Sequence, residues 1–126
     1  MRLAFVLLLA FLAACDPGVA VTYRVSMASQ ETDSISQLSV TIADAVAQQH
    51  AMQVRGTSDG CSLAYYYRPL GGGGWLDLCV TRGSNAVRLS VAEFLTYSWG
   101  AKGDALRHDL LDTLTAQFGA RVSQEK

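Results

Sequence analysis

Five segments of the chain alternate between apolar and polar residues. The first covers residues 19–27 and a short one covers 52–55. Three more, at 63–68, 75–81 and 87–92, follow one another with turn-forming residues between them. A period of two predicts strands with one apolar and one polar face. The last three runs indicate an antiparallel meander.

Two further segments carry apolar residues at helical spacing. The first starts at Ser34, which forms a capping-box pattern with Gln37, and ends near His50. The second starts at Asp104, a residue type that caps helices, and ends before Gly119, a natural helix stop. The predicted stripes are Ile35, Leu38, Ile42, Ala45, Val46 and Gln49 in the first helix, and Leu106, Leu110, Leu111, Leu114 and Phe118 in the second.

The element order is therefore β-α-β-β-β-β-α, and residues 120–123 can add a short closing strand. Each helix has one apolar stripe and each strand one apolar face. The simplest arrangement is an α+β two-layer sandwich, in which both helices lie on one face of a mostly antiparallel sheet. It is similar to a ferredoxin-like arrangement with an inserted hairpin. Residues 19–126 are expected to form a single domain.

The N-terminal segment has a different character. Residues 3–14 are apolar and Arg2 is the only charge before Cys15. The run is shorter than the roughly 20 residues that a membrane-spanning helix needs, and it has the marks of a secretory signal. Its end, Leu12-Ala13-Ala14-Cys15, resembles the lipobox of bacterial lipoproteins.

That resemblance implies cleavage before Cys15 and acylation of the new N-terminal cysteine. Residues 1–14 would then be a removed signal peptide, and residues 15–18 a lipidated cysteine with a short tether. Asp16 after the cysteine favours retention in the inner membrane, by the rule known for enterobacterial lipoproteins. An ordinary secretory signal with an incidental cysteine is the alternative.

Acylation of Cys15 leaves Cys61 and Cys79. In an oxidising exported compartment a disulfide between them is expected, and free buried thiols are the alternative. Two cysteines outside any short-spaced motif cannot form a closed zinc site alone, so no metal is predicted.

The strand pattern constrains this disulfide. Matching the apolar faces places Leu63 opposite Val80, which sets Cys79 opposite Ala64. Cys61 is then expected to lie off the ladder and to fold over from the preceding loop.

Charge and motifs exclude several function classes. The formal net charge is −1, which is too close to neutral to favour nucleic acid as a partner. The chain has no Gly-x-Ser-x-Gly elbow and no His-Glu-x-x-His spacing. His50 and His108 both fall on predicted helices. We expect a protein without catalytic activity and with no cofactor beyond the lipid on Cys15.

The polar strand positions carry the candidate chemistry. Four arginines and two aromatics are predicted on the sheet face opposite the helices, a composition typical of binding hot spots and suited to carboxylate or phosphate partners. The alternative is a solvated surface whose charges satisfy one another. A glycine run at 71–74 is a second candidate contact. The predicted partner-binding residues are Arg24, Arg55, Tyr66, Arg68, Trp75 and Arg88.

Together these features predict a membrane-anchored periplasmic lipoprotein that acts as a binding or accessory protein. Envelope-assembly, secretion-system and inhibitor or immunity roles all fit. The tether after Cys15 spans roughly 10–15 Å at most, so an envelope protein near the membrane is the expected partner. A small envelope enzyme with an unrecognised site and a self-associating structural lipoprotein are the alternatives.

Overall fold

A computed structural model describes residues 18–58, 60–68 and 74–125. Over these ranges the chain forms a six-stranded sheet and two long helices, with two short 3-10 turns. The elements are β1 (Gly18–Ser26), η1 (Ser29–Glu31), α2 (Thr32–Gln49), β2 (Gln53–Ser58), β3 (Cys61–Tyr67), β4 (Leu76–Arg82), β5 (Ala86–Phe94), α3 (Ala101–Phe118), η3 (Gly119–Arg121) and β6 (Val122–Glu125).

The sheet has the strand order β2-β3-β4-β5-β1-β6, and every neighbouring pair is antiparallel. Without β2 and β3, the remaining strands keep the ferredoxin-like order, with β1 between β5 and β6. The β2–β3 hairpin is inserted after α2 and extends the sheet at the β4 edge. The α+β fold with one mostly antiparallel sheet is therefore confirmed.

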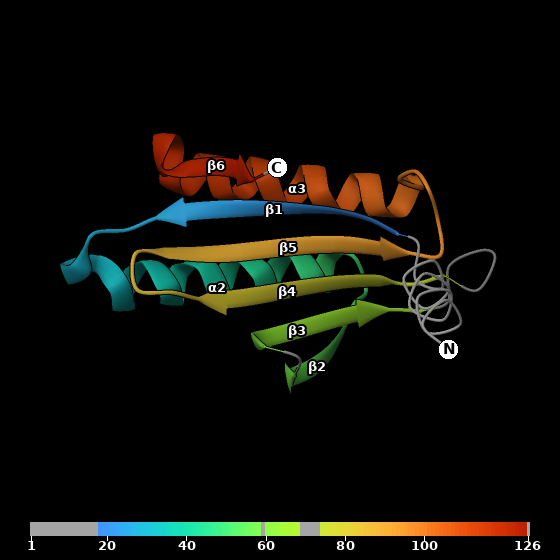
Figure 1. The fold of residues 1–126 in the computed structure, drawn as a ribbon, viewed down its shortest axis with the longest axis horizontal. Coiled ribbons are helices and arrows are strands. Elements are labelled where there is room, and N and C mark those ends of the chain that lie inside the picture. Colours follow the sequence, from blue (N-terminus) through green and yellow to red (C-terminus); the bar gives the residue numbers. More distant parts are fainter. Residues whose placement is uncertain (1–17, 59, 69–73, 126) are drawn as a thin grey trace, which may run out of the picture.

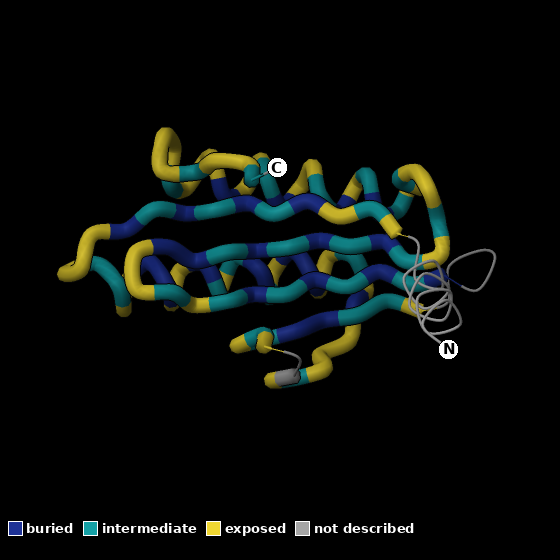
Figure 2. Tube along the Cα trace, viewed as in Figure 1, coloured by how far each residue is buried: buried dark blue, intermediate teal, exposed yellow. Residues whose placement is uncertain are grey.

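Both helices lie behind the sheet in the view of Figure 1, α2 across β4 and β5 and α3 across β1. The core fills the space between these two layers, and its buried segments follow the four central strands in Figure 2. Its largest fully buried side chains are Tyr23, Tyr65, Leu76, Leu78, Leu89, Leu106, Leu110 and Leu114. The stripe predicted for the second helix is correct, since Leu111 and Phe118 also pack against this core.

The start of α2 differs from the prediction. The helix begins at Thr32, so Ser34 lies in its first turn and is not the cap. The capping contact belongs instead to the short 3-10 turn η1 that precedes α2. There the Ala28 N–H donates a hydrogen bond to Glu31 Oε1 at 2.9 Å. Arg121 Nη1 lies 2.6 Å from the same carboxylate, and this ion pair, with the Ala28 N–H, lowers the pKa of Glu31.

The face that α2 buries includes Ile35, Ile42 and Val46 of the predicted stripe but is rotated from it. Leu38 remains 42% exposed, and the residues that turn toward the sheet are mostly small. Small side chains let the helix backbone approach the sheet closely, so close packing outweighs the burial of one large apolar residue. The buried residues of α2 are Ile35, Ser36, Ser39, Ala43, Val46 and Ala47.

The start of α3 depends on a buried carboxylate that the sequence pattern does not indicate. Asp104 does not cap the helix, because the helix begins at Ala101 with Gly100 as the N-cap residue. The Gly100 N–H donates to both oxygens of Glu93 in β5, at 3.1 and 3.2 Å. Glu93 is only 6% exposed. Its negative charge lies at the positive end of the helix dipole, which favours this arrangement.

Gly103 makes room for that carboxylate, and replacing it is expected to destabilise the domain. A Cβ atom at this position would overlap Glu93 Oε1 and approach Leu76 and Trp99 to 3.0 Å. Although alanine favours helices by about 1 kcal/mol over glycine, we expect Gly103→Ala to lower the free energy of unfolding by about 1–3 kcal/mol through overpacking. Urea unfolding measures this. Gln117→Ala on the exposed side of α3 is the control and should change stability by less than about 0.5 kcal/mol.

Two buried tyrosines join the sheet to the helices. The Tyr65 hydroxyl donates to Asp44 Oδ1 of α2 at 3.0 Å, and the Tyr23 hydroxyl donates to the Arg107 carbonyl of α3 at 3.2 Å. Burial raises the pKa of Tyr23. Burial and the hydrogen bond to Asp44 raise the pKa of Tyr65 further. Both phenols are therefore held neutral by the fold.

These raised pKa values predict alkaline destabilisation. The stabilisation is fully present below the ordinary tyrosine pKa of about 10 and is lost as the pH rises from there through the higher folded-state pKa values. Tyr65→Phe should cost about 1 kcal/mol near pH 7 through the lost hydrogen bond and should make the alkaline loss shallower. Urea unfolding between pH 7 and 11 measures both effects. Equal alkaline slopes for the two proteins would show that the fold does not hold Tyr65 neutral.

Candidate contact surface

The sheet face opposite the helices is the candidate site. We call it the open face, because among the described residues no helix or strand layer covers it. Its centre is polar, and the Thr22 and Ser90 hydroxyls lie 2.9 Å apart across β1 and β5. Strand register and side-chain contacts bring all six predicted residues to this face. Its described members include Thr22, Arg24, Arg55, Tyr66, Arg68, Trp75, Asp77, Cys79, Arg88, Ser90 and Glu125.

Two of the arginines form a cluster on β1 and β5. Arg24 and Arg88 are direct cross-strand partners, and both reach toward Glu125 on the neighbouring strand β6. Arg88 Nε lies 2.8 Å from Glu125 Oε1, whereas Arg24 Nε lies 3.9 Å from it. Arg24 Nη1 also donates to the Ser26 hydroxyl at 2.6 Å. One carboxylate thus serves two guanidinium groups.

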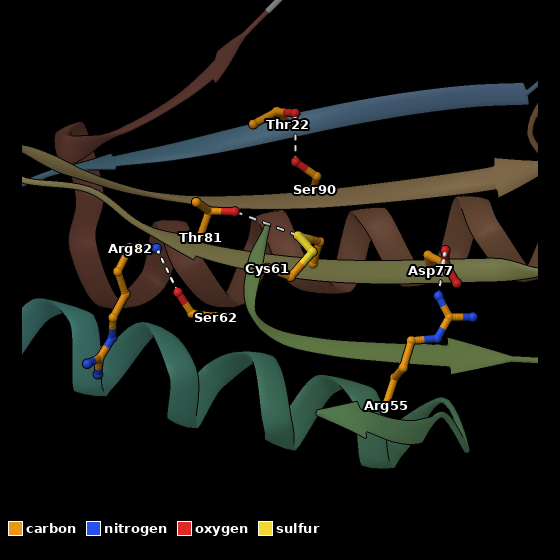
Figure 3. The surroundings of a disulfide bond; sticks show 9 residues. Thr22, Arg55, Cys61, Ser62, Asp77, Thr81, Arg82 and Ser90 are labelled. Carbon is orange, nitrogen blue, oxygen red and sulfur yellow. Dashed lines mark hydrogen bonds and ion pairs between the residues drawn. A yellow bond between two sulfur atoms is a disulfide. The ribbon is translucent and has the colours of Figure 1, made fainter. Parts of the chain in front are cut away.

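The third arginine spans the inserted hairpin and the central sheet. Arg55 Nη1 lies 3.7 Å from Asp77 Oδ2 of β4, and Figure 3 shows its side chain reaching from β2 toward that residue. Its guanidinium also lies 5.3 Å from the centre of the Tyr66 ring. The Tyr66 hydroxyl in turn donates to Gln53 Oε1 at 2.7 Å. These contacts hold the edge strand β2 against β3 and β4.

The fourth arginine lies at the end of the sheet where β1 begins. The Arg68 guanidinium covers the Trp75 ring at 4.8 Å from its centre. Trp75 is stacked on Phe94 with the ring centres 4.8 Å apart. Arginine on a tryptophan face is the favourable cation–π geometry. The predicted residues therefore lie on one face but in separate groups.

The charge balance of the open face is positive. Four arginines meet two carboxylates, Asp77 and Glu125, among its described residues. Internal partners of this kind were the alternative interpretation of the arginines, and the structure provides them. Half-exposed ion pairs contribute little stability, about 0–1 kcal/mol each, and they leave a surplus of guanidinium donors.

The disulfide joins Cys61 and Cys79, with 5.6 Å between their Cα atoms, and confirms that prediction. The β3–β4 register runs from Leu63 opposite Val80 and sets Ala64 opposite Cys79, as the apolar pattern required. Cys61 lies outside this register, as expected. It does not come from a loop, however, because it is the first residue of β3 and pairs with β2 across the hairpin.

The irregular β2–β3 pairing explains this geometry. The ladder shifts register twice between Val54 and Ser58, and such bulges bend and twist a strand. The bend brings the start of β3 over the open face, where Figure 3 shows the disulfide in front of β4. The disulfide therefore fixes the curled hairpin beside Arg55 and Asp77.

The two histidines are paired with carboxylates on the helices. His50 Nε2 lies 2.7 Å from Asp109 Oδ2, which links the end of α2 to α3. His108 Nδ1 lies 3.5 Å from Asp104 Oδ2 one turn earlier on α3. Within the described ranges, no group of three or more His, Cys, Asp or Glu residues is arranged to hold a metal ion. In the same residues, neither helix has the length and apolar character needed to cross a membrane.

The sequence was compared with protein-family models and with curated proteins. No protein-family model matches the sequence, and the search of curated proteins finds no match. Cys15 and residues 71–73 of the glycine run lie outside the described residues. The site must therefore be interpreted from its own residues.

Proposed function

We propose that this protein is a lipid-anchored envelope lipoprotein that binds an acidic envelope protein through the open face. The observation that carries the proposal is the uncovered sheet face itself, with four arginines against two carboxylates. Guanidinium groups bind carboxylates in a bidentate geometry and are enriched at binding hot spots. The lipobox-like Leu12-Ala13-Ala14-Cys15 supports the membrane location.

The centre of the partner surface is the Arg24–Arg88 cluster. The two guanidinium groups share Glu125, and the longer of their contacts is 3.9 Å. The Arg24 side chain is 27% exposed and that of Arg88 is 43% exposed. A partner carboxylate can therefore reach Arg88 without breaking a buried ion pair. Such contacts strengthen at low salt and accelerate association.

A matched pair of charge-reversal variants tests this proposal. Arg24→Glu/Arg88→Glu changes the open face, whereas Arg82→Glu/Arg121→Glu makes the same charge change away from it. After circular dichroism shows that both variants are folded, each is used to capture crosslinked partners from native membranes. We expect the parent and the control to capture the same protein and the open-face variant to lose it, with capture that weakens as salt rises.

Two results would count against the proposal. Equal capture by all three proteins would show that the arginines form only a solvated surface. A partner lost from the control and kept by the open-face variant would place the contact on another surface.

A further inference from the structure

We propose that the end of the domain where β1 begins rests on the membrane interface and holds the sheet upright on an anionic bilayer. This proposal rests on the acylation of Cys15 stated above and adds the surface that meets the lipid. The surface, which we call the aromatic end, gathers residues from the end of β3, the position before β4, the end of β5 and the bend that leads into α3. Its apolar members are Tyr67, Trp75, Phe94, Leu95, Tyr97 and Trp99.

Strand register brings these residues together although they are far apart in the chain. Gly18, the first residue of β1, is paired with Phe94 at the end of β5. The Phe94 N–H donates to the Trp75 carbonyl at 3.0 Å, and Tyr67 is paired with Leu76 at the end of β3. The two tryptophans of the chain both lie at this end. Tryptophan and tyrosine are the residues that gather at membrane–water interfaces.

The bend between β5 and α3 presents the most exposed apolar side chains of this end. Tyr97 is 89% exposed and Leu95 is 48% exposed. Leu95 has a φ of 61°, a left-handed conformation that bulky residues rarely adopt. A leucine held in an unfavourable backbone conformation and directed to the surface needs a reason, and insertion among lipid headgroups and acyl chains provides one.

The charges at this end fit an anionic lipid surface. Lys102 Nζ lies 3.9 Å from the centre of the Tyr67 ring, and the Arg68 guanidinium lies over Trp75. Each basic residue near an anionic membrane surface contributes about 1 kcal/mol of attraction. Glu93 is buried and accepts the hydrogen bond of Gly100, and Asp104 in the first turn of α3 is paired with Arg107.

The length of the tether determines which end of an acylated domain lies at the membrane. Only Asp16 and Pro17 separate Cys15 from Gly18, and a segment this short spans about 10 Å at most. The headgroup region of one leaflet is about 5–8 Å thick. An acyl-bearing Cys15 therefore brings the aromatic end to the headgroups, whatever else the domain binds.

The opposite end of the sheet has a different character. It is formed by the β4–β5 turn and by η1. Exposed polar residues there include Ser84 and Asn85 in the turn and Gln30 in η1. With nine residues in β1 and about 3.3 Å per residue, this end lies about 30 Å from the aromatic end. The open face then stands roughly perpendicular to the bilayer, where a partner in the same membrane can reach Arg24 and Arg88.

Because the natural tryptophans mark the aromatic end, their fluorescence tests the proposal. The full lipoprotein is reconstituted into vesicles of phosphatidylcholine and phosphatidylglycerol, with and without brominated acyl chains. We expect brominated lipid to reduce tryptophan emission by about twofold or more, because tryptophans at the membrane interface lie close to the acyl chains. A reporter at the far end, Ser84→Trp in a Trp75→Phe/Trp99→Phe background, should not be quenched.

Two variants separate specific contact from simple proximity. Leu95→Ser/Tyr97→Ser should reduce quenching of the native tryptophans, whereas Leu38→Ser on α2, which removes a similarly exposed leucine, should not. Co-flotation with vesicles shows whether the chain is anchored. An anchored protein whose native tryptophans are not quenched, or whose far-end reporter is quenched equally, overturns the orientation and leaves the anchor standing. If the protein purified from cells carries no acyl groups and does not co-float with vesicles, both proposals are overturned.

Discussion

Removing the Cys61–Cys79 disulfide is expected to lower the free energy of unfolding by about 3 kcal/mol. The two cysteines are 18 residues apart, and closing a loop of that size in the unfolded chain accounts for about this much. A domain of this size has a total stability of about 5–15 kcal/mol, so the loss is a large fraction. We expect the β2–β3 hairpin to open first, because its two strands pair irregularly and the disulfide is the covalent link between the start of β3 and β4.

Urea unfolding of Cys61→Ala/Cys79→Ala against the parent measures this effect. Thr81→Ala is the local control, because its hydroxyl lies 3.6 Å from Cys79 Sγ and its loss leaves the disulfide intact. The parent treated with a reductant should match the double variant. If the double variant unfolds within about 0.5 kcal/mol of the parent, the hairpin does not depend on the covalent link.

Replacing Cys15 with serine is expected to abolish acylation completely. The thiol is the group that carries the lipid in the lipoprotein class that Leu12-Ala13-Ala14-Cys15 resembles, and a serine hydroxyl does not substitute for it. Two or more acyl chains give stable anchoring, so the effect on membrane attachment of the mature protein should be equally complete.

Incorporation of labelled palmitate in cells and the intact mass of the mature protein measure this effect. The parent should carry label on a chain that starts at Cys15. Cys15→Ser should carry none, while Cys61→Ala/Cys79→Ala should keep its label. Label retained by Cys15→Ser, or a mature N-terminus elsewhere, would contradict the lipobox interpretation.

The strands and their register were predictable because a period of two leaves few choices. Matching apolar faces set Leu63 opposite Val80 and Ala64 opposite Cys79, and both pairs are found. The same alternation also brought the four arginines to one face. A slip of one residue would have exposed every apolar side chain of the strand, which makes this kind of prediction strong.

The helix ends and the charge partners were not predictable in the same way. The face of α2 was misjudged because Ser36, Ser39 and Ala43 pack closely on the sheet where Leu38 was expected. Glu93 continues the inward alternation of β5, and Gly100 lies only a few residues later in the chain. Only the fold shows that the Glu93 carboxylate accepts a hydrogen bond from the Gly100 N–H.

The pairing of Glu125 with both Arg24 and Arg88 joins the last strand to residues far earlier in the chain. The sequence indicated this contact only through the predicted short closing strand. Local sequence patterns cannot specify such a contact, because it depends on which strand lies beside β1 in the folded sheet.

The central claim is that the open face contacts an acidic envelope protein, and site-specific photo-crosslinking tests it most directly. A photoreactive amino acid is placed at Ser90, in the middle of the open face, or at Thr113, on the exposed side of α3. We predict that Ser90 crosslinks to a discrete membrane-associated protein, that salt weakens the crosslink, and that Arg24→Glu/Arg88→Glu removes it. Crosslinking from Thr113 with none from Ser90 would contradict the claim and assign the contact to the helices.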